Sequence, residues 1–169
     1  MTSARTTAAV IVALALGAAG WFAVARFTRV ELAPNVAYTL LDGRSTDLAA
    51  LRGKVVLVNF WATTCTTCVH EMPQIASTHE KFKARGYDTL AVAMRYDPPA
   101  NVIHFAEARQ LPFGVVIDNT GAMARGFGSV ELTPTSVLIN QRGEIVERIV
   151  GEPDFAALHW RIETLLAPT

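Results

Sequence analysis

The sequence predicts an α/β domain in which helices flank a central mixed β-sheet, preceded by one transmembrane helix. Two apolar runs, residues 55–58 and 89–94, have the composition of strands that are buried inside a sheet. A helical pattern lies between them, and the chain later ends in a hairpin followed by a last helix. Strands that alternate with helices run parallel and the final hairpin adds antiparallel strands, so the predicted sheet is mixed.

Length and composition limit the classes of function. The chain has 169 residues, of which 51% are hydrophobic, and 15 basic residues balance 15 acidic ones. This size fits one globular domain and one extra apolar segment. A neutral chain without a basic patch gives no electrostatic basis for binding nucleic acid.

The extra apolar segment is residues 6–25, which carry no charge and lie between Arg5 and Arg26. As a helix it would extend about 30 Å, the thickness of the hydrocarbon core of a membrane. It is either an uncleaved signal anchor or a secretory signal peptide that is cut after the small-residue pattern ending at Ala25. Both interpretations export the rest of the chain.

The first predicted elements of the exported part are a hairpin, a strand and a long helix. Residues 38–43 read as a short strand and a turn that begin an N-terminal hairpin. The apolar strand that starts at Val55 leads into a helix over residues 65–85. This helix is expected to end at Gly86, because glycine is favoured just past a helix C-terminus. The strand at residues 89–94 follows.

A second helix begins at Pro98 and Pro99 and continues to Arg109 through apolar side chains at helical spacing. The remaining predicted elements are a strand at residues 115–117, a short helix at 122–127, hairpin strands at 136–140 and 144–150, and a last helix at 154–166.

Cys65 and Cys68 are the only cysteines, and they stand three residues apart at the predicted start of the long helix. At that spacing the second thiol lies one turn from the first, so a disulfide can form without backbone movement. Free backbone N–H groups and the positive end of the helix dipole favour the thiolate of Cys65, which makes it the nucleophile. A bridge across so short a loop adds little stability, which indicates a chemical role.

The order of a buried strand, Phe60-Trp61-Ala62, Cys-x-x-Cys and then Pro73 resembles the thioredoxin fold. The motif ends with Glu-Met-Pro at residues 71–73, and this ending resembles more specifically the membrane-anchored TlpA/ResA-like thioredoxins, which serve extracytoplasmic disulfide reduction and cytochrome c maturation. The resemblance extends from about Tyr38 to the C-terminus. It implies a thioredoxin fold with an N-terminal hairpin and an inserted αβ element.

This family often carries Trp before the first cysteine and Pro before the second, where the present chain has Thr64 and Thr67. The difference concerns the reduction potential and the fit to partners rather than the class of reaction. Because the family is usually tethered, the resemblance favours the anchor over the cleaved signal peptide. The predicted organisation is a signal anchor at residues 1–30, a linker at 31–37 and a thioredoxin-like domain at 38–169.

Glu71 is the predicted proton acceptor for Cys68. It lies three residues after Cys68, which places both side chains on one helix face, and the ResA-like family carries Glu at this position. In cytoplasmic thioredoxins the position of Asn59 holds a buried Asp for this task, whereas an amide cannot accept the proton. Partial burial is expected to raise the pKa of Glu71 toward neutrality, and His70 is expected to be a surface residue near the site.

The predicted substrate-binding residues are Trp61, Thr133 and Pro134. The resemblance implies a cis Thr133–Pro134 bond that faces the disulfide and leaves the Thr133 backbone free to pair with an extended substrate segment. Trp61 is interpreted first as part of the core and the active-site wall, and second as a substrate contact.

These residues predict a protein-disulfide reductase that needs no cofactor and no metal, because thiol-disulfide exchange uses only the two thiols. Its expected partners are protein disulfides and a membrane electron donor that reduces it again. The alternative is a copper(I)-binding metallochaperone, or a reductant for copper-site assembly, that uses the same thiols. A structural zinc site would need a second Cys/His pair at finger-like spacing, which the histidines do not provide. The peroxiredoxin pattern is absent, because it requires Pro where this chain has Val58 and Thr where it has Ala62.

Overall fold

The computed structural model describes residues 30–167. The predicted anchor at residues 6–25 lies outside this range. Residues 32–167 belong to one compact unit. None of the helices within residues 30–167 is long and apolar enough to span a bilayer.

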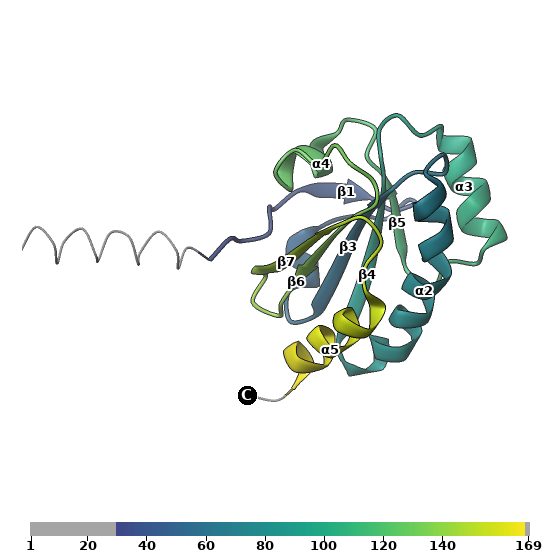
Figure 1. The fold of residues 1–169 in the computed structure, drawn as a ribbon. Helices are drawn as coiled ribbons and strands as arrows, with labels where there is room; N and C mark the ends of the chain where they lie inside the picture. Colours follow the sequence, from purple (N-terminus) through teal and green to yellow (C-terminus); the bar gives the residue numbers. More distant parts are fainter. Residues whose placement is uncertain (1–29, 168–169) are drawn as a thin grey trace, which may run out of the picture. The chain divides into compact units, whose positions relative to one another are not determined.

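A five-stranded mixed sheet forms the centre of the domain, in the order β5-β4-β3-β6-β7 (Figure 1). The strands are β3 (Val55–Trp61), β4 (Tyr87–Ala93), β5 (Gly114–Ile117), β6 (Thr135–Ile139) and β7 (Ile145–Val150). β3, β4 and β5 pair in parallel, whereas β6 pairs antiparallel with β3 and with β7. All seven residues of β3 are buried, as its apolar run predicts for a central strand. The predicted mixed sheet is confirmed.

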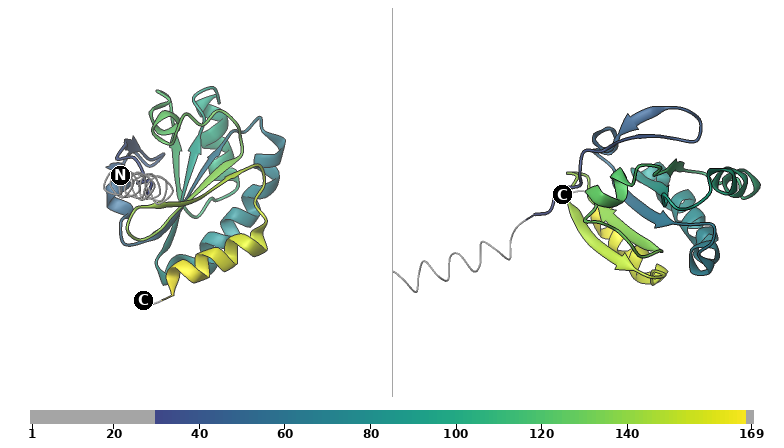
Figure 2. Two further views of the ribbon diagram at one scale, coloured as in Figure 1. Left: turned by 60° about the vertical axis from the view of Figure 1, so that its left-hand side comes forward. Right: turned by 90° about the horizontal axis from the view of Figure 1, so that it is seen from above.

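Helices cover one face of this sheet, and a hairpin with a short helix covers the other. The helical elements are α2 (Thr66–Phe82), η2 (Lys83–Arg85), α3 (Pro99–Ala108), α4 (Ala122–Gly126) and α5 (Phe155–Leu166). Alternate residues of β3 point to opposite faces, so Leu57 packs in the cluster with α2, α3 and α5, and Val58 packs in the cluster with α4 and the hairpin. The views in Figure 2 show the same layers.

The predicted N-terminal hairpin is present as β1 (Ala37–Thr39) and β2 (Ser45–Asp47), followed by η1 (Leu48–Leu51). Beyond β1, Leu40 bridges to Val116 and the Leu41 N–H donates to the Val115 carbonyl at 3.0 Å. The hairpin therefore also covers the outer edge of β5.

The long helix differs from its prediction at both ends. Cys65 is the N-cap rather than the first helical residue, and the α-helical part ends at Phe82. The last turn tightens into the 3₁₀ helix η2, which ends at Gly86 with a φ of 93°. The predicted stop at Gly86 is confirmed, because glycine adopts this left-handed conformation without a steric penalty.

Candidate active site

The two cysteines lie at the start of α2 and form a disulfide with a Cα–Cα distance of 5.2 Å. The backbone N–H of Cys68 donates to the Cys65 sulfur at 3.2 Å, so Cys65 caps the helix through its side chain. Cys65 is partly exposed, whereas Cys68 is completely buried. An incoming disulfide can therefore reach Cys65 and not Cys68, which agrees with the order of reaction predicted for the two thiols.

Glu71 faces a buried polar cluster contributed by three elements. The Asn59 side chain on β3 donates from Nδ2 to Glu71 Oε1 at 2.9 Å and to Ser136 Oγ, on β6, at 3.0 Å. All three residues are fully buried, so Glu71 is more deeply buried than the sequence predicts. Asn59 and Ser136 face each other directly across the β3–β6 pair. Sequence reasoning missed Ser136, because only the strand register brings it beside Asn59.

The environment of Glu71 raises its pKa to about 7, as expected for a buried carboxyl group. Burial is the main cause, the hydrogen bond from Asn59 opposes it, and the charge of Glu152 adds to it. Glu71 Oε2 has no hydrogen-bond partner within the described part of the chain. A group of this kind binds and releases a proton near neutral pH.

A carboxylate that the sequence analysis did not single out fixes the loop before Cys65. Asp97, which is 2% exposed, accepts hydrogen bonds from the backbone N–H and from Oγ1 of Thr63, both at 2.6 Å. Thr63 follows β3 and Asp97 follows β4. Since these neighbouring strands are parallel, the loops after them emerge at the same sheet edge, a signal that could have identified the pair.

The Thr133–Pro134 peptide bond is cis, as the family resemblance implies. Thr135 pairs with Phe60, so Pro134 lies at the same end of the sheet as the loop that carries Cys65. The Pro134 carbonyl accepts from the Gly151 N–H at 2.8 Å, and Thr133 Oγ1 lies 3.3 Å from the Tyr96 hydroxyl.

The interpretation of Trp61 as a substrate contact is wrong for this structure. Its side chain is fully buried and packs against Phe105, with ring centroids 5.1 Å apart. The alternation of a strand turns position 61 toward the core under the helices. The first interpretation of Trp61, as a core residue, is the one the structure supports.

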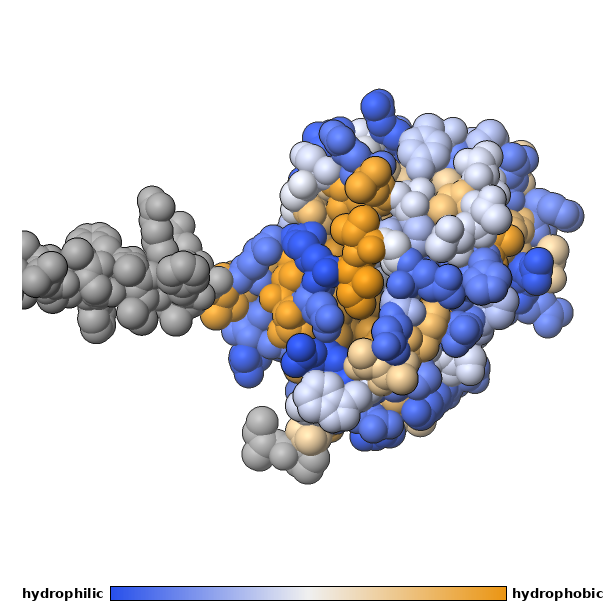
Figure 3. Space-filling model, in the orientation of Figure 1, coloured by the Kyte–Doolittle hydropathy of each residue, from blue (hydrophilic) through white to orange (hydrophobic). Residues whose placement is uncertain are grey.

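Large apolar side chains are instead exposed on both sides of the Pro134 loop. Tyr96 is 56% exposed and Leu132 is 65% exposed. Val150, which pairs with Thr135, is 65% exposed. In Figure 3 an apolar stripe crosses the face that carries β7 in Figure 1. Exposed apolar side chains therefore lie beside the loop that carries Pro134.

His70 is exposed, as predicted, and its Nδ1 lies 3.4 Å from the Glu152 carboxylate.

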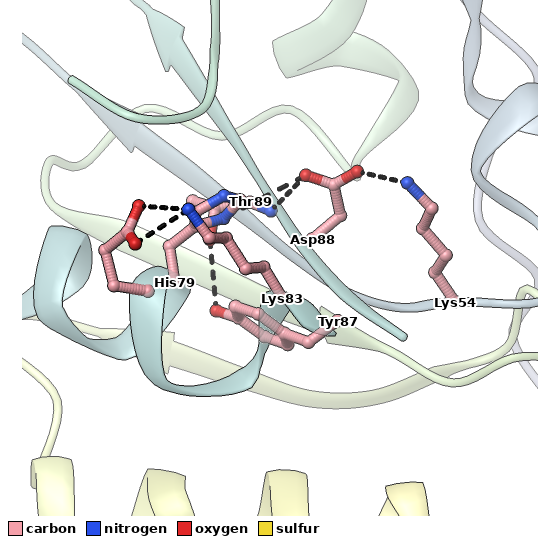
Figure 4. A network of polar contacts seen from close by, with 7 residues as sticks. Lys54, His79, Lys83, Tyr87, Asp88 and Thr89 are labelled. Atoms are coloured by element: carbon pink, nitrogen blue, oxygen red, sulfur yellow. Dashed lines mark hydrogen bonds and ion pairs between the residues drawn. The ribbon is translucent and has the colours of Figure 1, made fainter. Parts of the chain in front are cut away.

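A separate polar network involves the far end of α2, where His79 Nδ1 lies 4.0 Å from Asp88 Oδ1 and Lys54 donates to Asp88 at 2.7 Å (Figure 4). These residues line a groove of about 1210 Å³ to which neither cysteine contributes.

Within residues 30–167, His, Cys, Asp and Glu side chains form no group of three or more that could hold a metal ion. The alternative, copper(I) held by the two thiolates, stays a prediction.

Comparisons with known proteins agree with this chemistry. Residues 30–158 match the Redoxin family. The chain is 39% identical over 120 residues to the thiol-disulfide oxidoreductase ResA of Bacillus cereus, covering 71% of this chain and 68% of ResA. It is 36% identical over 149 residues to ResA of Geobacillus thermodenitrificans, covering 84% of each protein. The crystal structure of a thioredoxin-family thiol:disulfide interchange protein from Chlorobium tepidum superposes with a TM-score of 0.76 at 26% identity, covering 83% of this chain and 99% of that one.

Proposed function

We propose that this chain, which belongs to the Redoxin family and is a thioredoxin-like thiol-disulfide oxidoreductase, reduces specific protein disulfides outside the cytoplasm in cytochrome c maturation or a related redox assembly. The observation that carries the proposal is the asymmetric pair at the start of α2. Cys65 is accessible, Cys68 is buried, and a carboxyl group with a pKa of about 7 lies three residues further on.

The reaction proceeds by two exchanges. The Cys65 thiolate attacks one sulfur of the partner disulfide, which breaks that bond, forms a mixed disulfide and releases the first partner thiolate. Cys68 then gives its proton to the Glu71 carboxylate and attacks the Cys65 sulfur. This second exchange releases the second partner thiolate and leaves the Cys65–Cys68 disulfide. The protein is oxidised by two electrons, which a membrane electron donor must return.

The substrate polypeptide lies along the loop at Thr133 and Pro134. This loop is at the same sheet end as Cys65, and the exposed side chains of Tyr96 and Leu132 flank it. An extended segment on either side of the partner cysteine would pair with the Thr133 backbone and bury these apolar groups.

The domain is held on the extracytoplasmic side by the apolar residues 6–25. Two features support this location: the segment is long enough to cross a membrane as a helix, and reduction of protein disulfides is needed where disulfides form and persist.

The experiment that tests this function is covalent trapping. Cys68→Ser leaves Cys65 to form a mixed disulfide that cannot be resolved, so partner proteins should accumulate on Cys65. The matched control is Cys65→Ser, in which the remaining thiol is buried and should trap far less. Copper(I) binding by the wild-type protein without any reduction of a disulfide would contradict the proposal and favour a metallochaperone.

A further inference from the structure

Both N–H groups of the Asn59 side chain donate hydrogen bonds, and one of these bonds orients an oxygen of Glu71. One N–H donates to Glu71 Oε1 and the other to Ser136 Oγ, so the amide cannot rotate without losing a buried hydrogen bond. Two acceptor atoms of this cluster, Asn59 Oδ1 and Glu71 Oε2, have no partner among the described residues. Both donor groups of the Asn59 amide are thus used, whereas one acceptor oxygen on each of Asn59 and Glu71 is without a partner among the described residues.

The pair consists of the carboxyl group of Glu71 and the amide group of Asn59, and these two planar end groups have nearly the same shape. Asp has the shape of Asn, and Gln has the shape of Glu, so exchanging the two chemistries changes no volume. In the exchanged pair the amide of residue 71 would donate to the carboxylate of residue 59. The Ser136 hydroxyl accepts from Asn59 now, and by rotation it could donate to the new carboxylate instead. Each hydrogen bond of the cluster is then retained with its direction reversed.

We propose that Asn59 is a positioning residue that holds Glu71 for proton transfer, and that the site requires one carboxyl group in the 59/71 pair, on either the strand or the helix. This inference rests on the proposed role of Glu71 as proton acceptor for Cys68. The exchanged carboxyl group stays within the cluster, because the two side chains are already 2.9 Å apart.

The charged and titratable groups near this cluster come from few elements. Cys68 and exposed His70 are on α2, and Glu152 lies in the segment between β7 and α5. Asn59, which donates to Glu71, and Ser136, which accepts from Asn59, do not titrate. A pH profile that changes with the 59/71 pair therefore reports on its own carboxyl group.

The test measures the second exchange directly with Ellman's reagent. The Cys65 thiolate attacks this aromatic disulfide and releases one yellow thiolate in a step whose rate depends on reagent concentration. Cys68 then loses its proton, attacks Cys65 and releases the second yellow thiolate in a step that is independent of reagent concentration. Stopped-flow absorbance from about pH 5.5 to about pH 9 separates the two steps in the reduced full-length protein.

The single variant Glu71→Gln should slow the second step about tenfold near pH 6 to 7 and leave the first unchanged, since water replaces part of the general base. The exchanged variant Asn59→Asp/Glu71→Gln should return the second step to within about threefold of wild type. In Asn59→Asp alone, two carboxyl groups share one proton, so the rate should titrate in two steps and reach its plateau at higher pH.

The chain offers a matched control in Asn140 and Glu144, a second amide–carboxylate pair with Nδ2 and Oε2 2.6 Å apart, located at the β6–β7 turn. Asn140→Asp/Glu144→Gln should leave both rates unchanged. An exchanged variant that folds but remains as slow as Glu71→Gln would overturn the inference, and so would a wild-type profile in Asn59→Asp. Because the reagent reports on the thiols alone, these outcomes are independent of whether trapping finds a protein partner.

Discussion

The two cysteines have different environments, and this difference should appear in their reactivity. Cys65 is partly exposed at the open end of α2, whereas Cys68 is fully buried. In the reduced protein at about pH 6, iodoacetamide should therefore label Cys65 much faster than Cys68, because only Cys65 combines access with the favourable end of the helix dipole. Mass spectrometry of the labelled peptides distinguishes the two thiols, and preferential labelling of Cys68 would reverse their roles.

Burial of Glu71 should also make folding stability depend on pH. The pKa of this group rises from 4.5 to about 7, so between these values the folded state keeps a proton that the unfolded state has lost. Its contribution is full below about pH 4.5 and declines as the pH rises to about 7. Glu71→Gln lacks this decline. Its stability relative to wild type should therefore rise by on the order of 3 kcal/mol when the pH is raised from about 4.5 to about 8.

Urea unfolding of the oxidised proteins at both pH values measures this difference. The Glu144→Gln variant is a suitable control, because the pKa of Glu144 is lowered by its hydrogen bonds to Arg142 and Asn140. A stability difference between Glu71→Gln and wild type that is the same at both pH values would mean that Glu71 titrates normally in the folded protein.

At this scale, prediction succeeded where a residue's position depends on local spacing, whereas the role of Glu71 as proton acceptor stays a prediction. The i, i+3 relation placed Glu71 on the Cys68 face of the helix, and the helix start made Cys65 the accessible thiol. It failed where the role depends on strand pairing. Ser136 is 77 residues from Asn59 in sequence, and the side to which Trp61 points follows from the registration of β3 in the sheet.

At the scale of elements, the contact between the loops after β3 and β4 determines how the nucleophile is presented. Asp97→Asn should weaken both hydrogen bonds to Thr63 and loosen the loop before Cys65. Bonds to a buried charged group contribute about 1.5 to 3 kcal/mol each, so a drop in stability of a few kcal/mol is expected. Labelling of Cys65 by iodoacetamide should change its rate in the same variant.

Asp118 provides the comparison for that variant. It is also buried and accepts two bonds, from the N–H groups of Met123 and Ala124 at the start of α4. Asp118→Asn should reduce stability by a similar amount while the labelling rate of Cys65 stays at the wild-type value. Equal effects of the two variants on labelling would show that Asp97 acts only through general stability.

Most elements could be predicted because apolar runs, prolines and glycines mark them locally. The strands were placed within one or two residues of β4, β5, β6 and β7, and Gly86 marked the end of the long helix. The attachment of the hairpin to β5 through Leu40 could not be predicted, since a single bridge between distant residues leaves no periodic pattern. The pair of Asp97 and Thr63 was missed for the same reason.

At the scale of the whole molecule, the order of the strands assembles the site. β3 is central and antiparallel to β6, so the end of β3 that leads to Cys65 lies beside the beginning of β6, which follows Pro134. The parallel neighbour β4 ends at the same edge and supplies Asp97. Cys65, the Asp97 side chain that holds its loop and the Pro134 loop proposed to bind substrate therefore lie at the same end of the sheet, although about 70 residues of sequence separate the first from the last.

The export of this domain is tested with the full-length chain produced in bacteria. The uncharged segment at residues 6–25 should keep the protein in the membrane fraction after extraction at high pH, which removes proteins that are not inserted. The thiols should react with a membrane-impermeant maleimide in intact cells whose outer membrane has been made permeable, because the domain is expected on the extracytoplasmic side.

Arg5→Ala leaves the apolar segment intact and is the control for membrane retention. A soluble product that begins after Ala25 would establish a cleaved signal peptide instead, and labelling only after cell lysis would place the domain in the cytoplasm.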